Sequence, residues 1–177
     1  MGTLVMRRAT SADLQALHEF YVRIVAEGIP DIGLPGEEPN LEDLGTMLES
    51  PDAEFFLALD GRRVVAAIDV TTLSHASCSH TAYVNAMVDS SYRRRGIATG
   101  LCKILFEWVE EHPTVFRIQA EVAATNRPVR ALYEQHGFRV EGTHRKRYRT
   151  PEGWVNSQTI ARLWPEKQHT LQNSGSR

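Results

Sequence analysis

The sequence predicts an α/β fold built around a sheet of mixed strand direction, and three observations support this prediction. Strand-like and helix-like patterns alternate along the chain of 177 residues, which favours helices packed against a sheet. A hairpin pattern over 54–71 adds a pair of antiparallel strands to that alternation. Two more extended segments, over 138–163, add a second pair. The predicted order of elements is β, α, α, β, β, β, α, β, α, β, β.

The first elements are a short strand over 4–8 and a helix that follows it. The segment Thr10-Ser-Ala-Asp13 matches a capping box, and the apolar residues after it keep helical spacing. Proline and glycine interrupt the loop over 29–40 too often for regular structure. A second, short helix is expected over 41–48.

The predicted hairpin joins strands over 54–59 and 64–71 through the turn Asp60-Gly61. A connection rich in Ser and His, over 73–80, leads to another strand over 82–88. The remaining elements are a helix over 96–111, a strand over 115–122, a helix from Asn126 to Gly137, and strands over 138–149 and 154–163. We expect a single domain over 1–164 and a flexible polar tail over 165–177.

Composition excludes several classes of protein. Lys and Arg total 20 against 22 for Asp and Glu, so the net charge of −2 disfavours a globally basic nucleic-acid binder. Cys78 and Cys102 are too few for a secreted disulfide framework. No apolar run approaches a membrane span and the N-terminus lacks a signal-peptide core, so we expect a cytoplasmic protein without a membrane partner.

The segment that carries chemistry runs from Val84 to Leu101, where a strand ends, a turn follows and a helix begins. A helix start presents unpaired backbone N–H groups and the positive end of the helix dipole. Gly96 and Ala98 leave room for a ligand beside that backbone, and the run Arg93-Arg-Arg95 adds positive charge. These features suit a diphosphate. From the residues alone, a solvated basic turn before an ordinary helix explains the pattern equally well.

The sequence Arg93-x-x-Gly96-x-Ala98, after a strand that ends in Met87-Val88, resembles the pyrophosphate loop of the GNAT superfamily of acyl-CoA N-acyltransferases. A second motif agrees: Glu121-Val-Ala-Ala-Thr-Asn126, followed by Ala131-Leu-Tyr133-Glu-Gln-His-Gly137-Phe138. The resemblance covers nearly the whole chain and implies a GNAT-like, mostly antiparallel central sheet flanked by about four helices.

Three positions depart from the family pattern. Ala98 stands where Gly is commoner, Arg94 where Gly is frequent, and Ser91 where Pro is common. Because the phosphate contacts would be made by main-chain groups, these departures should leave binding intact.

The resemblance implies a metal-free N-acetyltransferase that moves an acetyl group directly from acetyl-CoA to a primary amine: an amino acid, a small amine or a protein N-terminus. The main chain of Met87 and Val88 would hold the pantetheine arm, and Asn126 would contact that arm beside the thioester. The implied pyrophosphate-binding residues are Arg93, Arg94, Arg95, Gly96, Ile97, Ala98 and Thr99. Tyr133 would point its hydroxyl at the sulfur and protonate the departing thiolate, since a phenol of pKa near ~10 can donate to a basic sulfur. A helix aromatic packed in the core also fits Tyr133.

A base is also needed, because an ammonium must lose a proton before its nitrogen can attack a carbonyl carbon. Glu121 is the candidate, because a related branch that acetylates protein N-termini carries its base on the strand before the position of Asn126. A rim carboxylate in solvent explains Glu121 nearly as well. Asp69 and Asn85 are weaker candidates, for positioning a water.

Other charged groups have several interpretations. The acidic loop with Asp31, Glu37 and Glu38 would attract a cationic amine. A basic cluster near the last strands consists of Arg139, Arg145, Lys146, Arg147 and Arg149. Three interpretations of this cluster stay open: a solvated face, a surface that attracts the phosphates of the cofactor, or a contact for an acidic acceptor such as RNA. The pattern His75-x-x-Cys78-x-His80 lacks the fourth ligand of a structural zinc site and indicates a polar loop.

Two alternatives to an enzyme stay open. One is a non-catalytic acyl-CoA sensor of the same fold, against which Tyr133 argues. The other is a nucleic-acid-associated module that uses the arginines, which the net charge disfavours. A homodimer is compatible with the sequence.

Overall fold

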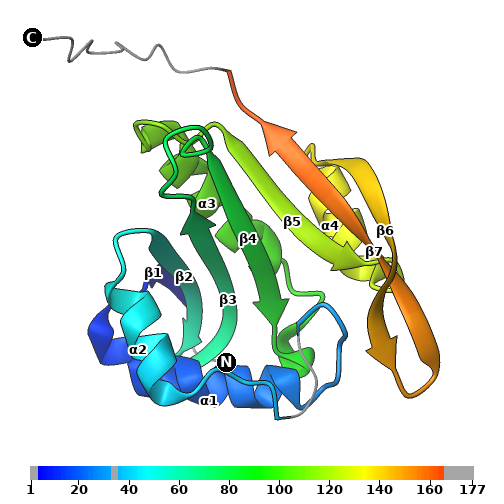
Figure 1. Ribbon diagram of the computed structural model, residues 1–177. Coiled ribbons are helices and arrows are strands. Elements are labelled where there is room, and N and C mark those ends of the chain that lie inside the picture. Colours follow the sequence, from blue (N-terminus) through cyan, green and yellow to red (C-terminus); the bar gives the residue numbers. More distant parts are fainter. Residues whose placement is uncertain (1–3, 33–35, 166–177) are drawn as a thin grey trace, which may run out of the picture.

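The computed structural model describes residues 4–32 and 36–165, which form one seven-stranded sheet and four α-helices (Figure 1). The elements are β1 (Leu4–Arg8), α1 (Leu14–Val25), α2 (Leu41–Glu49), β2 (Ala53–Asp60), β3 (Arg63–Thr72), β4 (Thr81–Val88), α3 (Ile97–Glu111), β5 (Arg117–Ala123), α4 (Arg127–Gln135), β6 (Arg139–Thr150) and β7 (Gly153–Leu163). Short 3₁₀ turns, η1 (Ser11–Asp13) and η2 (Ser90–Tyr92), precede α1 and α3. The predicted order and fold class are confirmed. The predicted flexible tail spans 165–177, and its residues from 166 on lie outside the described part of the chain.

The sheet has the strand order β1-β2-β3-β4-β5-β7-β6, and every neighbouring pair is antiparallel except β4 and β5. The parallel pair is short, because only Thr81–Tyr83 of β4 lie in register with Arg117–Gln119 of β5. Beyond these residues the two strands diverge (Figure 1). A split therefore opens between the C-terminal halves of the two central strands.

Helices cover both faces of the sheet and bury separate apolar clusters. On one face α1 and α2 contribute Leu17, Phe20 and Leu44, which pack with Phe55 of β2 and Met87 of β4. Phe56, the next residue along β2, belongs to the other cluster because successive strand residues point to opposite faces. That cluster lies under α3 and also receives Tyr133 from α4. The two faces thus have distinct cores.

The entry into α1 is fixed by a carboxylate. The Thr10 backbone N–H donates to the Asp13 carboxylate at 2.8 Å, as the capping-box pattern predicts. Arg7 on β1 donates two more hydrogen bonds to Asp13, at 2.7 and 2.8 Å, and these hold the pKa of Asp13 at about 2. Because the first turn closes as the 3₁₀ segment η1, the α-helix itself begins at Leu14.

Within the described part of the chain, no helix is both long and apolar enough to cross a membrane.

Candidate active site

Two adjoining cavities occupy the split between β4 and β5. The smaller, of about 270 Å³, lies among α1, α2, β3, β4, β5 and the start of α4. The larger, of about 510 Å³, runs between the start of α3 and one side of α4. The residues that line both cavities are Ile32, Ala86, Met87, Asn126 and Val129. This shared wall makes one continuous site with two compartments.

The larger cavity carries the predicted cofactor loop. Every residue predicted to bind the cofactor lines it except Arg95 and Tyr133, and Tyr133 lines the smaller cavity instead. Gly96 caps α3 with φ of 75°, and nothing lies within 4 Å of where a Cβ on Gly96 would be. The N–H groups of the first helical turn have no acceptor within a helix. The loop thus offers open space, amide donors and the positive end of a dipole at one point.

Arg94 adopts a left-handed backbone conformation, with φ of 61°. That conformation costs a residue with a side chain roughly 1–2 kcal/mol, whereas Gly adopts it freely. The departure from the family pattern at Arg94 therefore brings backbone strain into the loop. Arg95 turns away from the cavity, since its guanidinium lies over the Tyr92 ring and donates to the Ser91 carbonyl at 2.7 Å.

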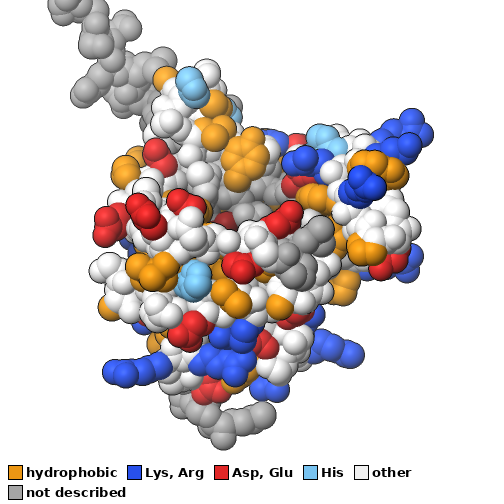
Figure 2. Space-filling view, turned by 60° about the horizontal axis from the view of Figure 1, so that its bottom comes forward, with side chains coloured by type: hydrophobic (Ala, Val, Ile, Leu, Met, Phe, Trp, Pro, Cys, Tyr) orange, Lys and Arg blue, Asp and Glu red, His pale blue; other side chains and the backbone are white. Residues whose placement is uncertain are grey.

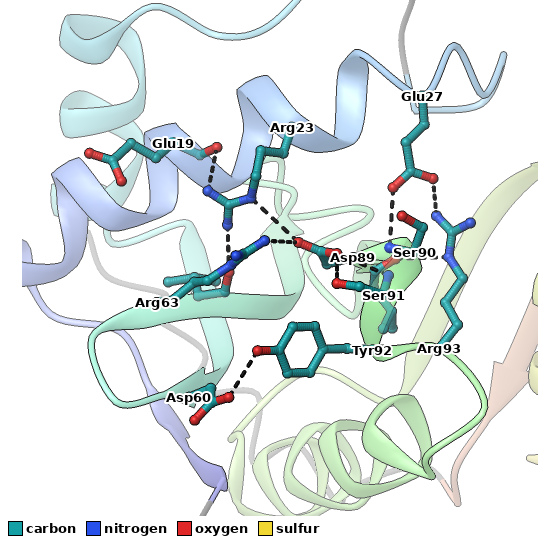
Figure 3. A network of polar contacts seen from close by, with 12 residues as sticks. Glu19, Arg23, Glu27, Asp60, Arg63, Asp89, Ser90, Ser91, Tyr92 and Arg93 are labelled. Carbon is teal, nitrogen blue, oxygen red and sulfur yellow. Dashed lines mark hydrogen bonds and ion pairs between the residues drawn. The ribbon is translucent and has the colours of Figure 1, made fainter. Parts of the chain in front are cut away.

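A buried carboxylate, Asp89, anchors this loop to the rest of the molecule (Figure 3). It accepts hydrogen bonds from the Ser91 hydroxyl at 2.6 Å and the Ser91 backbone N–H at 3.1 Å. Arg63 of β3 donates to it at 2.8 Å and Arg23 of α1 at 3.4 Å. Burial would raise the pKa of Asp89, but hydrogen bonds from Ser91 and Arg63 hold that pKa at about 2. Sequence reasoning missed Asp89; an Asp before Ser-Ser at a strand end is the available signal for a capped turn.

Arg93 makes two contacts in the same network. It forms an ion pair with Glu27, just beyond α1, and its Nε donates to the Val88 carbonyl at 2.9 Å (Figure 3). Glu27 also accepts from the Ser90 backbone N–H at 3.3 Å. The side chain of Arg93 is thus held at the wall of the larger cavity by a carboxylate.

The smaller cavity is acidic. Its polar lining consists of Tyr21, Asp31, Asp69, Asn85, Glu121, Asn126 and Tyr133. No Lys, Arg or His lies among the described residues of this lining. In the space-filling view, acidic side chains lie in the middle of the face, and Lys and Arg side chains gather at its lower part and at the margin (Figure 2). Such a cavity attracts a cation.

Asp69 lies on β3 beside Asn85 of β4, its partner in the strand register. One carboxylate oxygen accepts a hydrogen bond from the Asn85 amide at 2.7 Å, and the other accepts from the Tyr21 hydroxyl at 3.1 Å. The residue is 6% exposed, and burial raises the pKa of Asp69 to about 6. The sequence ranked Asp69 as a weak candidate and did not identify Tyr21 as a site residue. The available signal for Tyr21 is a hydroxyl on the apolar face of a helix, because a buried tyrosine hydroxyl needs a hydrogen-bond partner.

Tyr133 is 2% exposed and packs against Phe138 with ring centroids 4.8 Å apart. Burial raises the pKa of its hydroxyl above the ordinary value, and electrostatic interactions with Cys102, Asp69 and Asp31 raise it further. The hydroxyl is therefore protonated at neutral pH. Tyr133 is both a core aromatic and a lining residue of the smaller cavity.

Glu121 is held by β6 and β7. Its carboxylate accepts from the Ser157 hydroxyl at 2.6 Å, from Arg147 at 2.7 Å and from the Tyr148 hydroxyl at 3.4 Å. Burial acts to raise the pKa of Glu121, but the hydrogen bonds from Ser157 and Arg147 bring it below its ordinary value. Its side chain is 34% exposed, so Glu121 lies at the rim of the cavity.

Asn126 and Asp31 join the walls of the two cavities. The Asn126 side-chain amide donates to the two Asp31 oxygens at 3.3 and 3.1 Å, and Asp31 also accepts from the Ala123 backbone N–H at 3.1 Å. The loop after α1 is thereby tied to the junction of β5 and α4. Glu37 and Glu38, which the sequence grouped with Asp31, do not line either cavity.

Three further features that the sequence singled out lie outside the two cavities: Cys102, the basic cluster and His80. Cys102 is buried in the core, as predicted, and burial raises the pKa of its thiol to about 11. The basic cluster lies on the exposed strand β6, where Arg147 pairs with Glu121 and Arg149 lies over the Trp154 ring. His80 stacks on Phe116 with centroids 4.8 Å apart.

Comparison with known proteins identifies the family. The sequence model of the acetyltransferase (GNAT) family matches residues 15–138. The chain belongs to this family. It is therefore an N-acetyltransferase that moves acetyl groups to amines, which confirms the family and enzyme class expected from the two motifs.

A curated relative and two solved structures extend the match over most of the chain. The chain is 25% identical over 164 residues to the L-amino acid N-acetyltransferase AaaT of Escherichia coli strain K12, covering 92% of this chain and 99% of that protein. A GNAT-family acetyltransferase from Streptococcus pneumoniae superposes with a TM-score of 0.84 at 20% identity, covering 92% of this chain and 100% of that one. A GCN5-related N-acetyltransferase from Kribbella flavida superposes with a TM-score of 0.78 at 26% identity, covering 91% and 98%.

Enzymes of this family use acetyl-CoA as the acetyl donor. The larger cavity fits such a donor, because the open space at Gly96 and the amides of the following turn suit a diphosphate. Apolar walls from Ile29, Ala131 and Leu132 suit the arm that carries the thioester.

Proposed function

We propose that this enzyme transfers the acetyl group of acetyl-CoA directly to the primary amine of a free amino acid or a similarly small amine. The observation that carries the proposal is the acid-lined cavity of about 270 Å³ that adjoins the predicted cofactor groove. Three carboxylates and no described cation in its lining favour an ammonium group. The named activity of the Escherichia coli relative supports an amino acid as the acceptor.

In this proposal the donor lies in the larger cavity. Its diphosphate meets the amides of Arg94 to Thr99, and the main chain of Met87 and Val88 runs beside the pantetheine arm. The Val88 carbonyl already accepts from Arg93, so the donor would share this acceptor with that side chain. Asn126, which lines both cavities, stands where the thioester would pass from one to the other.

The amine nitrogen attacks the thioester carbonyl carbon, and the carbon–sulfur bond breaks. Tyr133 is the proposed donor of the proton that the departing thiolate takes, since its hydroxyl is protonated, buried and in the cavity wall. The role of Glu121 as the base stays a prediction. Its rim position and its ion pair with Arg147 also suit attraction of the incoming ammonium.

A panel of amines, monitored by release of the CoA thiol, tests the proposal. It should contain free L-amino acids, simple alkyl amines, and peptides that present the same amino acids at their N-termini. Turnover of free amino acids with little turnover of the peptides is expected. Turnover of the peptides alone would reject the small acceptor. Thermal stabilisation by acetyl-CoA without turnover of any amine would favour the non-catalytic sensor.

A further inference from the structure

The deprotonation of the acceptor ammonium needs a carboxylate that faces the reacting nitrogen, and the site holds two candidates besides Asp31. Asp69 and Glu121 both line the smaller cavity. They differ in surroundings: Asp69 is bonded only to neutral groups, whereas Glu121 is paired with the guanidinium of Arg147. A carboxylate that already neutralises a cation is a poor proton acceptor.

The position of Asp69 in the cavity favours it over Glu121 as the proton acceptor. It lies on the face of β3 covered by α1 and α2, at the inner wall of the cavity, and only 6% of its surface is exposed. Tyr21 and Asn85 each occupy one of its oxygens with a single hydrogen bond. A carboxylate has about four lone-pair sites, so both oxygens can still accept. Tyr133 lines the same cavity, and the charge of Asp69 is close enough to raise the pKa of its hydroxyl.

We propose that the Asp69 carboxylate takes the proton from the acceptor ammonium, with Tyr21 and Asn85 as the residues that position it. The inference rests on the proposed function and names its base. One N–H bond of the ammonium breaks and its proton goes to Asp69, leaving a neutral amine. The nitrogen then bonds to the acetyl carbon as the carbon–sulfur bond breaks, and the thiolate takes the proton of Tyr133. The second proton lost by the nitrogen restores the Tyr133 hydroxyl, and the proton on Asp69 leaves to solvent.

The electrostatic surroundings agree with this role. Around Asp69 the described ionisable groups of the cavity are Tyr21 from α1, Asp31 from the following loop, Glu121 from β5 and Tyr133 from α4. None of them is a cation. The hydrogen bonds from Asn85 and Tyr21 act to lower the pKa of Asp69, but burial outweighs them and that pKa rises to about 6. A base is most effective when its pKa lies near the working pH. Glu121 has a lowered pKa, for which Arg147 and Ser157 are responsible.

The test compares Asp69→Asn with Glu121→Gln, a matched pair in which each carboxylate becomes the amide of the same size. For each protein, kcat and KM are measured from pH 4.5 to 9 with the best acceptor from the amine panel. Asp69→Asn should lower kcat by about 100- to 10,000-fold. It should also abolish the acid limb of the kcat–pH profile, which is the fall of kcat below about pH 6, while the KM for acetyl-CoA stays within a few-fold of the wild-type value. Glu121→Gln should keep the limb.

A second readout does not depend on turnover. In protein labelled with ¹³C at the Asp side-chain carboxyl, the resonance that Asp69→Asn removes should titrate near pH 6. Titration near the ordinary value of an Asp would overturn the proposal. It would also be overturned if Asp69→Asn kept the wild-type limb, whatever its rate, or if Glu121→Gln alone lost it. Wild-type protein that acetylates no amine would instead reject the proposed function, and this inference with it.

Discussion

Asp69 and Tyr133 reach the same cavity from opposite faces of the sheet. Asp69 lies on the face of β3 that α1 and α2 cover, and Tyr133 comes from α4 and packs in the cluster under α3. They can share a cavity because β4 and β5 stop pairing after Tyr83 and Gln119. The proposed proton acceptor and the proposed proton donor thereby reach one cavity from the two faces of the sheet.

Replacing Tyr133 by Phe should lower the rate of acetyl transfer and leave acetyl-CoA binding nearly unchanged. The ring still packs on Phe138, so the fold should persist, and only the proton donor is lost. The expected loss is about 100- to 10,000-fold, or roughly 3 to 5 kcal/mol of barrier. Single-turnover transfer to the best amine measures it. Tyr83→Phe, at an exposed position on β4, is the control. A wild-type chemical rate in Tyr133→Phe would leave Tyr133 with a packing role only.

Acetyl-CoA should stabilise the fold through the loop at Gly96. At a concentration ~100 times its dissociation constant, a ligand adds about 2.7 kcal/mol to the free energy of unfolding. Gly96→Glu should remove most of this increment, because the side chain places negative charge in the open space of the loop. Gly96→Ala is the matched control, since it shares the strain at φ of 75° without the charge. An equal loss in both variants would contradict the electrostatic explanation.

The stability of the fold should depend on the ionisation of Asp69. Its pKa rises from 3.8 to about 6 on folding, so the folded state holds its proton more tightly and stability falls as pH rises through about 6. The shift corresponds to about 3 kcal/mol. Asp69→Asn should therefore be more stable than wild type by up to about 3 kcal/mol at pH 8, and by nearly nothing below pH 4. Urea unfolding at both pH values measures this difference.

Glu121→Gln is the control for that measurement, because its expected change in the free energy of unfolding at pH 8 has the opposite sign. The pKa of Glu121 is lowered on folding, so its ionised form stabilises the fold above its unfolded pKa and this contribution is lost on acidification. The variant should therefore be less stable than wild type at pH 8. A destabilised Asp69→Asn at pH 8 would show that the hydrogen bonds to Asp69 outweigh its burial.

Asp89→Asn should destabilise the fold and weaken acetyl-CoA binding together. The pKa of Asp89 falls from 3.8 to about 2 on folding, which contributes about 2 kcal/mol above pH 4 that is lost as pH falls toward 2. The amide can still accept from Ser91, but it leaves Arg23 and Arg63 without their carboxylate. Thermal unfolding with and without acetyl-CoA measures both effects. Asp52→Asn, the same change of charge at an exposed position, should do neither.

The order of elements was predictable because each depends on neighbouring residues. The hairpin turn at Asp60-Gly61, the capping box at Thr10 and the cap at Gly96 are all local signals. The partners of the site carboxylates are distant in the chain: Tyr21 lies 48 residues from Asp69, and Arg147 lies 26 residues from Glu121. Position in a strand does not reveal such partners, so the sequence ranked the rim carboxylate Glu121 above the buried Asp69.

The short pairing of β4 with β5 also has a consequence for how the molecule opens. Among the described residues, only three register pairs of the sheet join the antiparallel block β1–β4 to the block of β5, β7 and β6. We expect the second block to exchange its amide hydrogens with solvent by local openings that leave β2 and β3 protected. A donor lying in the split would touch β4, α3 and α4 at once and suppress those openings. Binding of the cosubstrate is then coupled to the closed arrangement of the two blocks. Hydrogen exchange measures this coupling, because amides far from the bound molecule should exchange more slowly.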